Sequence, residues 1–150
     1  TFIDETGGEN SNLFVKHRAP LSTHERFIAF LTEHWAGNFP TWLSPNQAQV
    51  ITISEKQNEY GGKVAETLEK AGVRTKTDFS DNTIGKKIRV HRKMRPAYML
   101  IIGEEESKKK TVAIRNRDGK QSNDVALNDF VKEILEEIKN RSVELKIVPS

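Results

Sequence analysis

The last two thirds of the chain alternate between short apolar runs and segments whose apolar residues recur at spacings of three and four. The run at residues 98–102 is apolar on both alternating faces, which is typical of a strand covered by helices on each side. Residues 127–138 form the most strongly amphipathic helix pattern, and its apolar stripe requires a sheet to cover. This alternation predicts an α/β layer structure whose mixed sheet has parallel strands, one antiparallel hairpin and residues 98–102 near its middle.

The other elements after Pro45 follow from the apolar period and from helix and turn signals. We expect strands near 48–53, 73–78 and 111–117. One helix should end before Gly72, and a short one, capped by Asn82, should end before Pro96. We expect residues 104–110 to form a hairpin turn, Asp118-Gly119 to form a second turn, and residues 146–150 to be a loose tail.

Residues 1–44 have a different pattern from the rest of the chain. Two apolar runs, at 1–4 and 13–16, flank a turn-forming stretch and predict a β-hairpin. Apolar residues at helical spacing predict a helix from about residue 21 to residue 36. Two prolines, Pro40 and Pro45, then interrupt regular structure. We therefore expect a segment boundary between residues 37 and 45.

Length and composition exclude several classes of protein. A chain of 150 residues forms one ordinary domain, or one domain with part of a neighbour. It has no cysteine, so disulfides and thiolate chemistry are excluded, and no apolar run approaches the roughly 20 residues of a membrane span. This composition fits a cytoplasmic protein. The first residue is Thr rather than Met and no signal peptide follows it, so we expect the chain to start inside a longer protein.

Positive charge is concentrated at residues 86–95, although the net charge of the chain is only +3. With Ile84 and Ile88 turned inward, Lys87 and Arg89 are expected on flanking or outward positions. A patch that contacts phosphates and a solvated surface are both consistent with this cluster. Its members are Lys86, Lys87, Arg89, Arg92, Lys93 and Arg95, with His91 among them.

A second charged set surrounds the hairpin after the central strand. Glu104, Glu105 and Glu106 precede the hairpin strand, and Arg115 and Arg117 lie in it or just beyond it. Arginine and glutamate can hydrogen-bond base edges, but an acidic triplet in a turn is often merely solvated, so both interpretations stay open here.

Residues near the start of the chain give weaker indications of a functional site. An arginine at a strand-to-helix junction can hold a nucleotide phosphate, or it can pair with Glu25 or Glu33. His17 has no second ligand at metal-binding spacing. The sequence has no P-loop, no glycine run with dinucleotide spacing and no convincing nucleophile–base set.

Motifs spread over residues 2–141 resemble the bacterial threonyl-tRNA synthetases. They are His17-Arg18-Ala19, Glu25-Arg26-Phe27-Ile28, the block at 36–45, Ala71-Gly72-Val73-Arg74, Lys87-Ile88-Arg89, Tyr98-Met99-Leu100 and Val112-Ala113-Ile114-Arg115. A match of this length is far more specific than any single motif.

The resemblance implies that residues 1–44 are the end of a class II catalytic core and residues 45–150 an anticodon-binding domain, a mixed five-stranded sheet flanked by helices. It further implies that Arg26, in the third class II signature motif, binds ATP-Mg, and that His17 is one of three zinc ligands in the intact enzyme. The other two ligands and the first two motifs are missing from this sequence. The chain alone is therefore expected to hold no cofactor, to bind no zinc and to form no threonyl-adenylate.

For RNA, the resemblance implies a tRNA(Thr) partner, with a homodimer expected for the intact enzyme and a monomer for this chain. Glu106 is expected beside Arg115 on one sheet surface. Asp81 replaces an Asn of the family, and its carboxylate cannot donate a hydrogen bond and repels phosphate. The anticodon-reading positions are Arg89, Glu106, Arg115 and Asp81, and the phosphate-contacting ones are Lys86, Lys87, Arg92 and Lys93.

Two alternatives remain open from the sequence. One is the corresponding domain of a prolyl, histidyl or glycyl synthetase. The other, from a different functional class, is a free-standing α/β interaction module that kept the fold and does not bind RNA.

Overall fold

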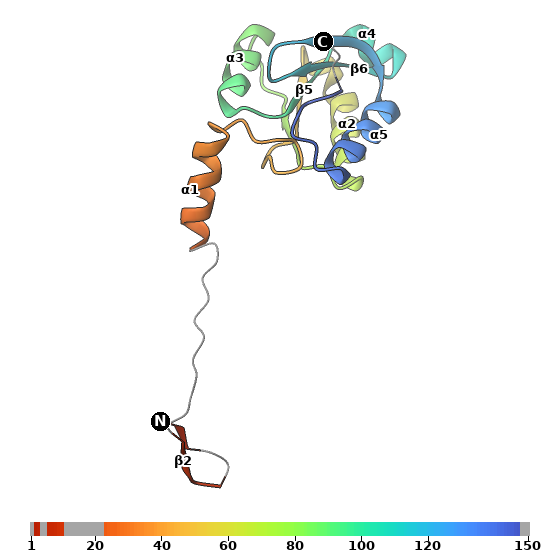
Figure 1. Ribbon diagram of the computed structural model, residues 1–150. Coiled ribbons are helices and arrows are strands. Elements are labelled where there is room, and N and C mark those ends of the chain that lie inside the picture. Colours follow the sequence, from red (N-terminus) through yellow and green to blue (C-terminus); the bar gives the residue numbers. More distant parts are fainter. Residues whose placement is uncertain (1, 4–5, 11–22, 148–150) are drawn as a thin grey trace.

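The computed structural model describes residues 2–3, 6–10 and 23–147 (Figure 1). None of its helices in these ranges is long and apolar enough to cross a membrane. Its elements, in chain order, are β1 (Phe2–Ile3), β2 (Glu9–Asn10), α1 (His24–His34), β3 (Ala48–Thr52), a 3-10 turn (Glu55–Gln57), α2 (Asn58–Lys70), β4 (Thr75–Asp78), α3 (Ile84–Met94), β5 (Tyr98–Ile102), α4 (Glu104–Lys109), β6 (Thr111–Asn116), β7 (Gln121–Ala126) and α5 (Leu127–Lys139).

The main sheet has five strands in the order β4-β3-β5-β6-β7. Strands β4, β3 and β5 are parallel, β6 pairs antiparallel with β5, and β7 pairs antiparallel with β6. The expected mixed α/β sheet, with residues 98–102 as its middle strand, is confirmed.

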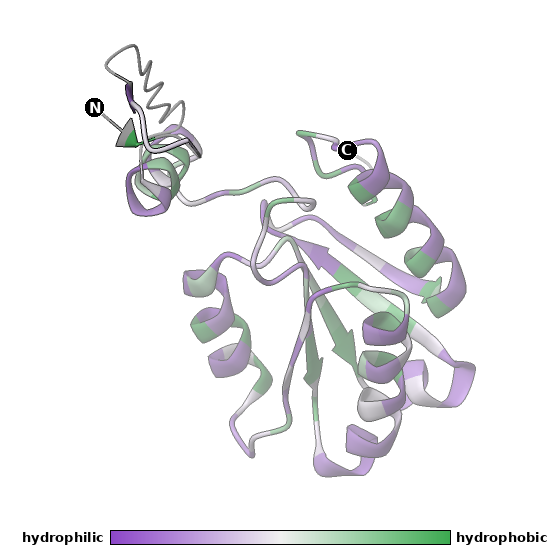
Figure 2. Ribbon diagram, turned by 90° about the horizontal axis from the view of Figure 1, so that it is seen from below, coloured by the Kyte–Doolittle hydropathy of each residue, from purple (hydrophilic) through white to green (hydrophobic). Residues whose placement is uncertain are grey.

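Helices cover both faces of this sheet (Figure 2). On one face Val50, Leu100 and Ile114 pack with Leu68 of α2 and Phe130 of α5 in a single buried core. Because successive side chains of a strand point to opposite faces, the intervening residues of β3, β5 and β6 point to the other face, where α3 lies. These intervening residues, which include Ile51, Met99, Ile101 and Ala113, are also buried.

Two elements differ from the sequence prediction. Residues 104–109, expected as a turn, form helix α4, because Glu104 pairs with Lys108 at 2.7 Å and Glu106 caps the first turn. Strand β7 was not predicted because it is a polar edge strand, with a bulge where Asp124 takes a φ of +57°. The expected turn at Asp118-Gly119 is confirmed, with Gly119 at a φ of +92°.

The segment before residue 35 contains a hairpin and a helix, as expected. The hairpin pairs Phe2 with Asn10 and Ile3 with Glu9, so its second strand comes earlier than residues 13–16, which lie outside the described residues. Helix α1 begins after its N-cap Thr23 and extends away from the sheet (Figure 1). Its apolar side chains Ile28 and Phe30 are 59% and 60% exposed.

The start of the C-terminal tail packs onto the domain. The Lys146 N–H donates to Glu137 Oε2 at 3.3 Å, and Ile147 packs against the core. The expectation of a loose tail from residue 146 is therefore wrong for these two residues, and residues 148–150 lie outside the described part.

Candidate nucleic-acid interface

The surface of α3 that faces away from the sheet is basic. Ile84, Ile88 and His91 recur at helical spacing and are half-buried. Arg89, Arg92 and Lys93 are exposed, and basic residues in the last turn are favoured by the helix dipole. The N-cap is Thr83 rather than the expected Asn82, whose Oδ1 accepts a hydrogen bond from Lys86 Nζ at 2.8 Å.

Lys87 does not belong to this exposed surface. Its side chain is only 2% exposed, and its Nζ donates to the carbonyl oxygen of Thr52, at the end of β3, at 2.8 Å. The prediction that Lys87 lies on a flanking or outward position and contacts phosphate is wrong, because Lys87 lies at the sheet-facing side of the helix, next to the stripe of Ile84, Ile88 and His91.

The C-terminal half of α3 borders a hollow of about 630 Å³, which we call the linker hollow. Its wall is completed by the residue after α3, by the turn between β6 and β7, and by the segment at residues 35–47, which we call the linker. The residues that line it are Asn38, Arg89, Arg92, Lys93, Arg95, Arg117 and Asp118.

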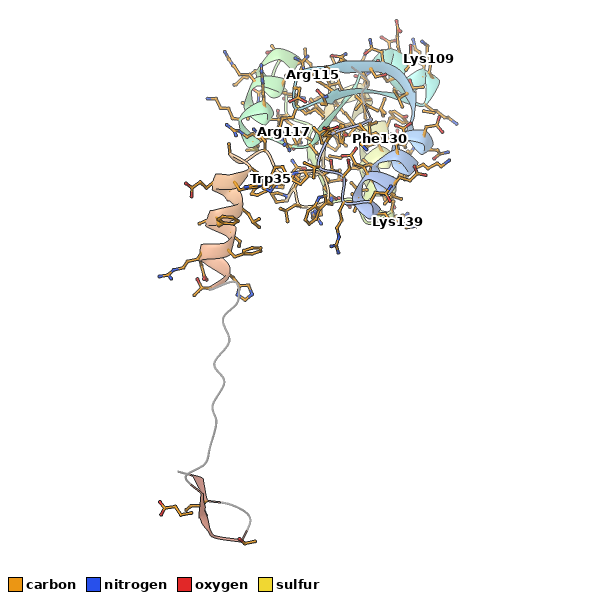
Figure 3. All side chains as sticks on the ribbon, in the orientation of Figure 1. Trp35, Lys109, Arg115, Arg117, Phe130 and Lys139 are labelled. Atoms are coloured by element: carbon orange, nitrogen blue, oxygen red, sulfur yellow. The ribbon has the colours of Figure 1, made fainter. Side chains whose placement is uncertain are left out.

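Arg115 lies on the α3 side of the sheet. It pairs with Met99 across β5 and β6, and it therefore points to the face opposite α5. Figure 3 shows Arg115 and Arg117 beside α3, with Phe130 and Lys139 on α5. Within residues 23–147, the Arg115 guanidinium makes no hydrogen bond or ion pair, and its Nη2 would lie 3.5 Å from a Cβ added at Gly119. Its donors are free for a ligand.

Glu106 lies on the same side of the sheet but does not contact Arg115. Its Oε2 accepts a hydrogen bond from the N–H of Gly103 at 2.9 Å, one residue past β5. A Cβ at Gly103 would be 2.8 Å from that oxygen, so the carboxylate needs a glycine there. Gly103 is four residues beyond Met99, or roughly 13 Å along a strand. The two side chains share a face, as expected, but the expectation that they are neighbours is wrong.

The remaining predicted residues are spread over the molecule. Asp81 is exposed in the loop before α3, and Arg26 is exposed on α1, where no ion pair with Glu25 or Glu33 occurs. His17 lies outside the described residues, and in the described ranges no group of three histidine or carboxylate side chains is placed to hold a metal ion. The zinc and ATP-Mg sites implied for the intact enzyme stay predictions.

A hydrogen bond between Asp78 and His91 fixes α3 to the edge of the sheet. His91 Nε2 and Asp78 Oδ2 are 2.6 Å apart, and both side chains are largely buried. Burial acts to raise the pKa of Asp78, but hydrogen bonds from Ser80 and His91 outweigh it and lower the pKa to about 2. The orientation of α3, and hence of its basic surface, therefore depends on a charged Asp78.

The linker is held by arginines whose role the sequence did not reveal. Arg95 Nη1 donates to the carbonyl of Ala36, and Arg117 Nη2 donates to the carbonyl of Phe39 at 2.8 Å. Arg74 donates to the carbonyls of Trp42 and Ser44, each at 2.9 Å. The Arg95 and Arg117 contacts join positions 59 and 78 residues apart, so no local pattern could have indicated them.

Comparison with known proteins gives one family. The profile of the family described as "Anticodon binding domain" matches residues 47–137. The threonine–tRNA ligase of Acetivibrio thermocellus is 43% identical over 141 residues, which is 94% of this chain and 22% of that protein. The ligase of Legionella pneumophila is 46% identical over 119 residues, or 79% of this chain and 18% of that protein. The chain thus spans about a fifth of the length of these relatives.

Solved structures agree with this match. The RNA-binding domain of threonyl-tRNA synthetase from Cryptosporidium parvum superposes with a TM-score of 0.74 and 40% identity, covering 80% of this chain and 30% of that one. Prolyl-tRNA synthetase from the same organism superposes with a TM-score of 0.59 and 26% identity, covering 68% of this chain and 23% of that one. Histidyl-tRNA synthetase from Nostoc shares the fold, with a TM-score of 0.60 and 24% identity, over 76% of this chain and 27% of that one. The chain belongs to the family of anticodon-binding domains.

Proposed function

We propose that this chain recognises the anticodon of tRNA(Thr) as part of a threonine–tRNA ligase. The observation that carries the proposal is a set of polar groups on the α3 side of the sheet that make no hydrogen bond or ion pair to residues 23–147, namely the Arg89 and Arg115 guanidiniums and one oxygen of Glu106. The higher identity to threonyl enzymes, 40% against 26% for a prolyl enzyme, supports threonine over the related specificities.

The separation of Glu106 from Arg115 determines how they would read RNA. Arginine donates two parallel hydrogen bonds to guanine O6 and N7, whereas a glutamate oxygen accepts from a base N–H, which in uracil is N3–H. Groups roughly 13 Å apart along a strand suit two different nucleotides better than two edges of one base. Arg115 and Glu106 would then distinguish the G and U common to threonine anticodons at separate positions.

Exposed basic residues would contact the phosphate backbone of the RNA. Lys86, Arg92 and Lys93 lie on the exposed side of α3, near the base-reading groups, and each phosphate that they neutralise would release counterions. Asp81, exposed in the loop before α3, cannot donate the hydrogen bond that an Asn would, so it contributes no favourable contact to an anionic backbone.

The intact enzyme would combine this module with a catalytic core. We place the boundary between residues 44 and 45, because the family match begins at residue 47 and the linker precedes it. In the intact homodimeric ligase, Arg26 on α1 would hold ATP-Mg and His17 would help to hold the catalytic zinc. The substrate would be cytoplasmic tRNA(Thr).

Affinity for matched RNAs tests the anticodon assignment. We expect wild-type protein to bind tRNA(Thr) more tightly than the same tRNA with a substituted anticodon. Arg115→Ala should weaken binding of the cognate tRNA by about 1–3 kcal/mol and reduce that preference, because it removes a bidentate base contact. Fluorescence anisotropy at fixed salt measures both effects.

The matched control is Lys132→Ala, a cation removed from the exposed surface of α5 on the opposite side of the sheet. It should leave both affinities unchanged. Equal affinity of the wild-type protein for the two tRNAs would overturn the assignment, and so would an Arg115→Ala variant with unchanged preference.

A further inference from the structure

The linker hollow lies between the basic end of α3 and the segment that joins α1 to the sheet. Arg92 and Lys93 approach it from α3, Arg117 from the turn between β6 and β7, and Asn38 from the linker. Arg95 follows α3 directly and completes the wall. The hollow thus collects groups from three parts of the chain that are distant in sequence.

The lining of this hollow carries an excess of positive charge. Its lining contains five arginine and lysine side chains and a single carboxylate, Asp118, an excess of four positive charges on a chain whose net charge is +3. No ion pair within residues 23–147 involves any of the five cations. Like charges at such close quarters repel, so a bound anion would relieve an unfavourable arrangement.

Arg117 supplies the most specific evidence for a missing partner. Its Nη2 donates to the carbonyls of Phe39 and Arg95, at 2.8 and 3.2 Å, but its Nε is buried without any acceptor. A buried donor without a partner costs free energy, and a bound ligand is one way to satisfy it. Burial lowers the pKa of Arg117, and the neighbouring Arg95 adds to this effect while Asp118 opposes it.

We propose that the linker hollow binds a phosphodiester of the RNA backbone, so that the RNA contacts the junction between α1 and the anticodon-binding domain. Several guanidinium forks suit phosphate oxygens, which accept paired N–H donors. This inference rests on the proposed function, because it needs bound RNA, but it concerns a phosphate contact at the linker rather than a base contact, and of the base-reading groups only Arg89 lines the hollow. Because Arg95 and Arg117 also hold the carbonyls of Ala36 and Phe39, a phosphate bound here would order the linker.

Salt dependence of tRNA binding tests the site. We expect the double variant Arg92→Ala/Lys93→Ala to lower the slope of log affinity against log salt by about one, since one phosphate contact contributes about 0.9. Measurements between about 50 and 200 mM salt cover the useful range. The loss should be the same factor for tRNA(Thr) and for the anticodon-substituted tRNA, because a phosphate contact carries no base information.

Hydrogen exchange of the linker amides gives a second and independent readout. Binding of tRNA should slow exchange at residues 36–39 in the wild-type protein, and this protection should be lost in the double variant. Inorganic phosphate alone should give no such protection. Saturable protection by inorganic phosphate without RNA would assign the hollow to a free anion and overturn the proposal.

The outcomes separate this inference from the proposed function. The control Lys132→Ala should keep the wild-type salt slope, since that side chain lies on the far side of the sheet. If the wild-type protein prefers the cognate tRNA but the double variant keeps the wild-type slope, the hollow is not a phosphate site and anticodon recognition survives. If the wild-type protein shows no preference between the tRNAs, the proposed function itself fails.

Discussion

Two buried charged side chains, Lys87 and Glu137, are satisfied by neutral groups rather than by opposite charges. Lys87 Nζ donates to a backbone carbonyl. Glu137, only 5% exposed, accepts hydrogen bonds from the hydroxyls of Thr41 and Tyr98, the latter at 2.7 Å. Burial, followed by the neighbouring Glu137 carboxylate, raises the pKa of Tyr98 far above its usual range, so the phenol keeps its proton and donates. Each residue ties distant segments together.

Removing the Glu137 carboxylate should destabilise the fold. Glu137→Ala leaves the hydroxyls of Thr41 and Tyr98 and the N–H of Lys146 without their acceptor. We expect a loss of about 3 kcal/mol in the free energy of unfolding, measured by urea denaturation. The control is Glu136→Ala, the exposed neighbour on α5, which should change stability by less than about 0.5 kcal/mol. An equal loss of unfolding free energy in the two variants would show that the hydrogen bonds to Glu137 do not stabilise the fold.

Lys87 provides a complementary test, because this lysine should contribute to the stability of the fold and not to RNA binding. Lys87→Met keeps the buried stem and removes the amine, which is inaccessible to a ligand. We expect its tRNA affinity and salt slope to match those of the wild type. Lys86→Ala, one residue earlier and exposed, should weaken tRNA binding and lower the slope by about one. A lowered slope for Lys87→Met would show that the amine reaches phosphate after all.

At the scale of elements, the hydrogen bond between Asp78 and His91 fixes α3 against β4. The folded-state pKa of Asp78 is about 2, below its usual 3.8, so its stabilising contribution is complete above about pH 4. It is lost as the pH falls from about 4 to 2. A difference of this size corresponds to about 2 kcal/mol.

Acid denaturation of paired variants measures this contribution. Between about pH 5 and pH 2, the wild-type protein should lose about 2 kcal/mol more of its free energy of unfolding than Asp78→Asn, which cannot titrate at that position. Other carboxylates titrate in both proteins and cancel in the difference. The same pH dependence in both proteins would mean that the charged form of Asp78 does not contribute to the stability of the fold.

The elements that the sequence predicted correctly are those with a long and regular apolar pattern. Strand β5 and helix α5 were predicted because their apolar patterns are long and regular. Helix α4 lacks an apolar stripe, and its signals are Glu–Lys pairs four residues apart and a capping glutamate. Strand β7 has Val125 and Ala126 as its only apolar residues, and its pairing to β6 across a bulge is a tertiary effect.

At the scale of the whole molecule, the linker connects α1 to the sheet through contacts from separate elements. Arg74, Arg95 and Arg117 hold its backbone carbonyls, and Glu137 holds Thr41. The direction in which α1 leaves the domain, visible in Figure 1, is therefore set by the module that would bind RNA.

Of the candidate site, sequence resemblance predicted the residue types and the shared face of the sheet. It did not predict that Glu106 lies at the far end of that face from Arg115, because Glu106 is part of the cap of a helix that had no apolar signal. Nor did it predict that Lys87 is buried, because a lysine on an inward stripe looks like a solvated residue. Distances along a strand and side-chain burial depend on the assembled fold.

An NMR titration with the anticodon stem-loop of tRNA(Thr) tests the central claim most directly. We predict that backbone amide shifts change in α3, at residues 103–106 and along β6, and that α2 and α5 on the opposite face are spared. Changes concentrated on α2 and α5, or no changes at all, would contradict recognition of RNA by the α3 side of the sheet.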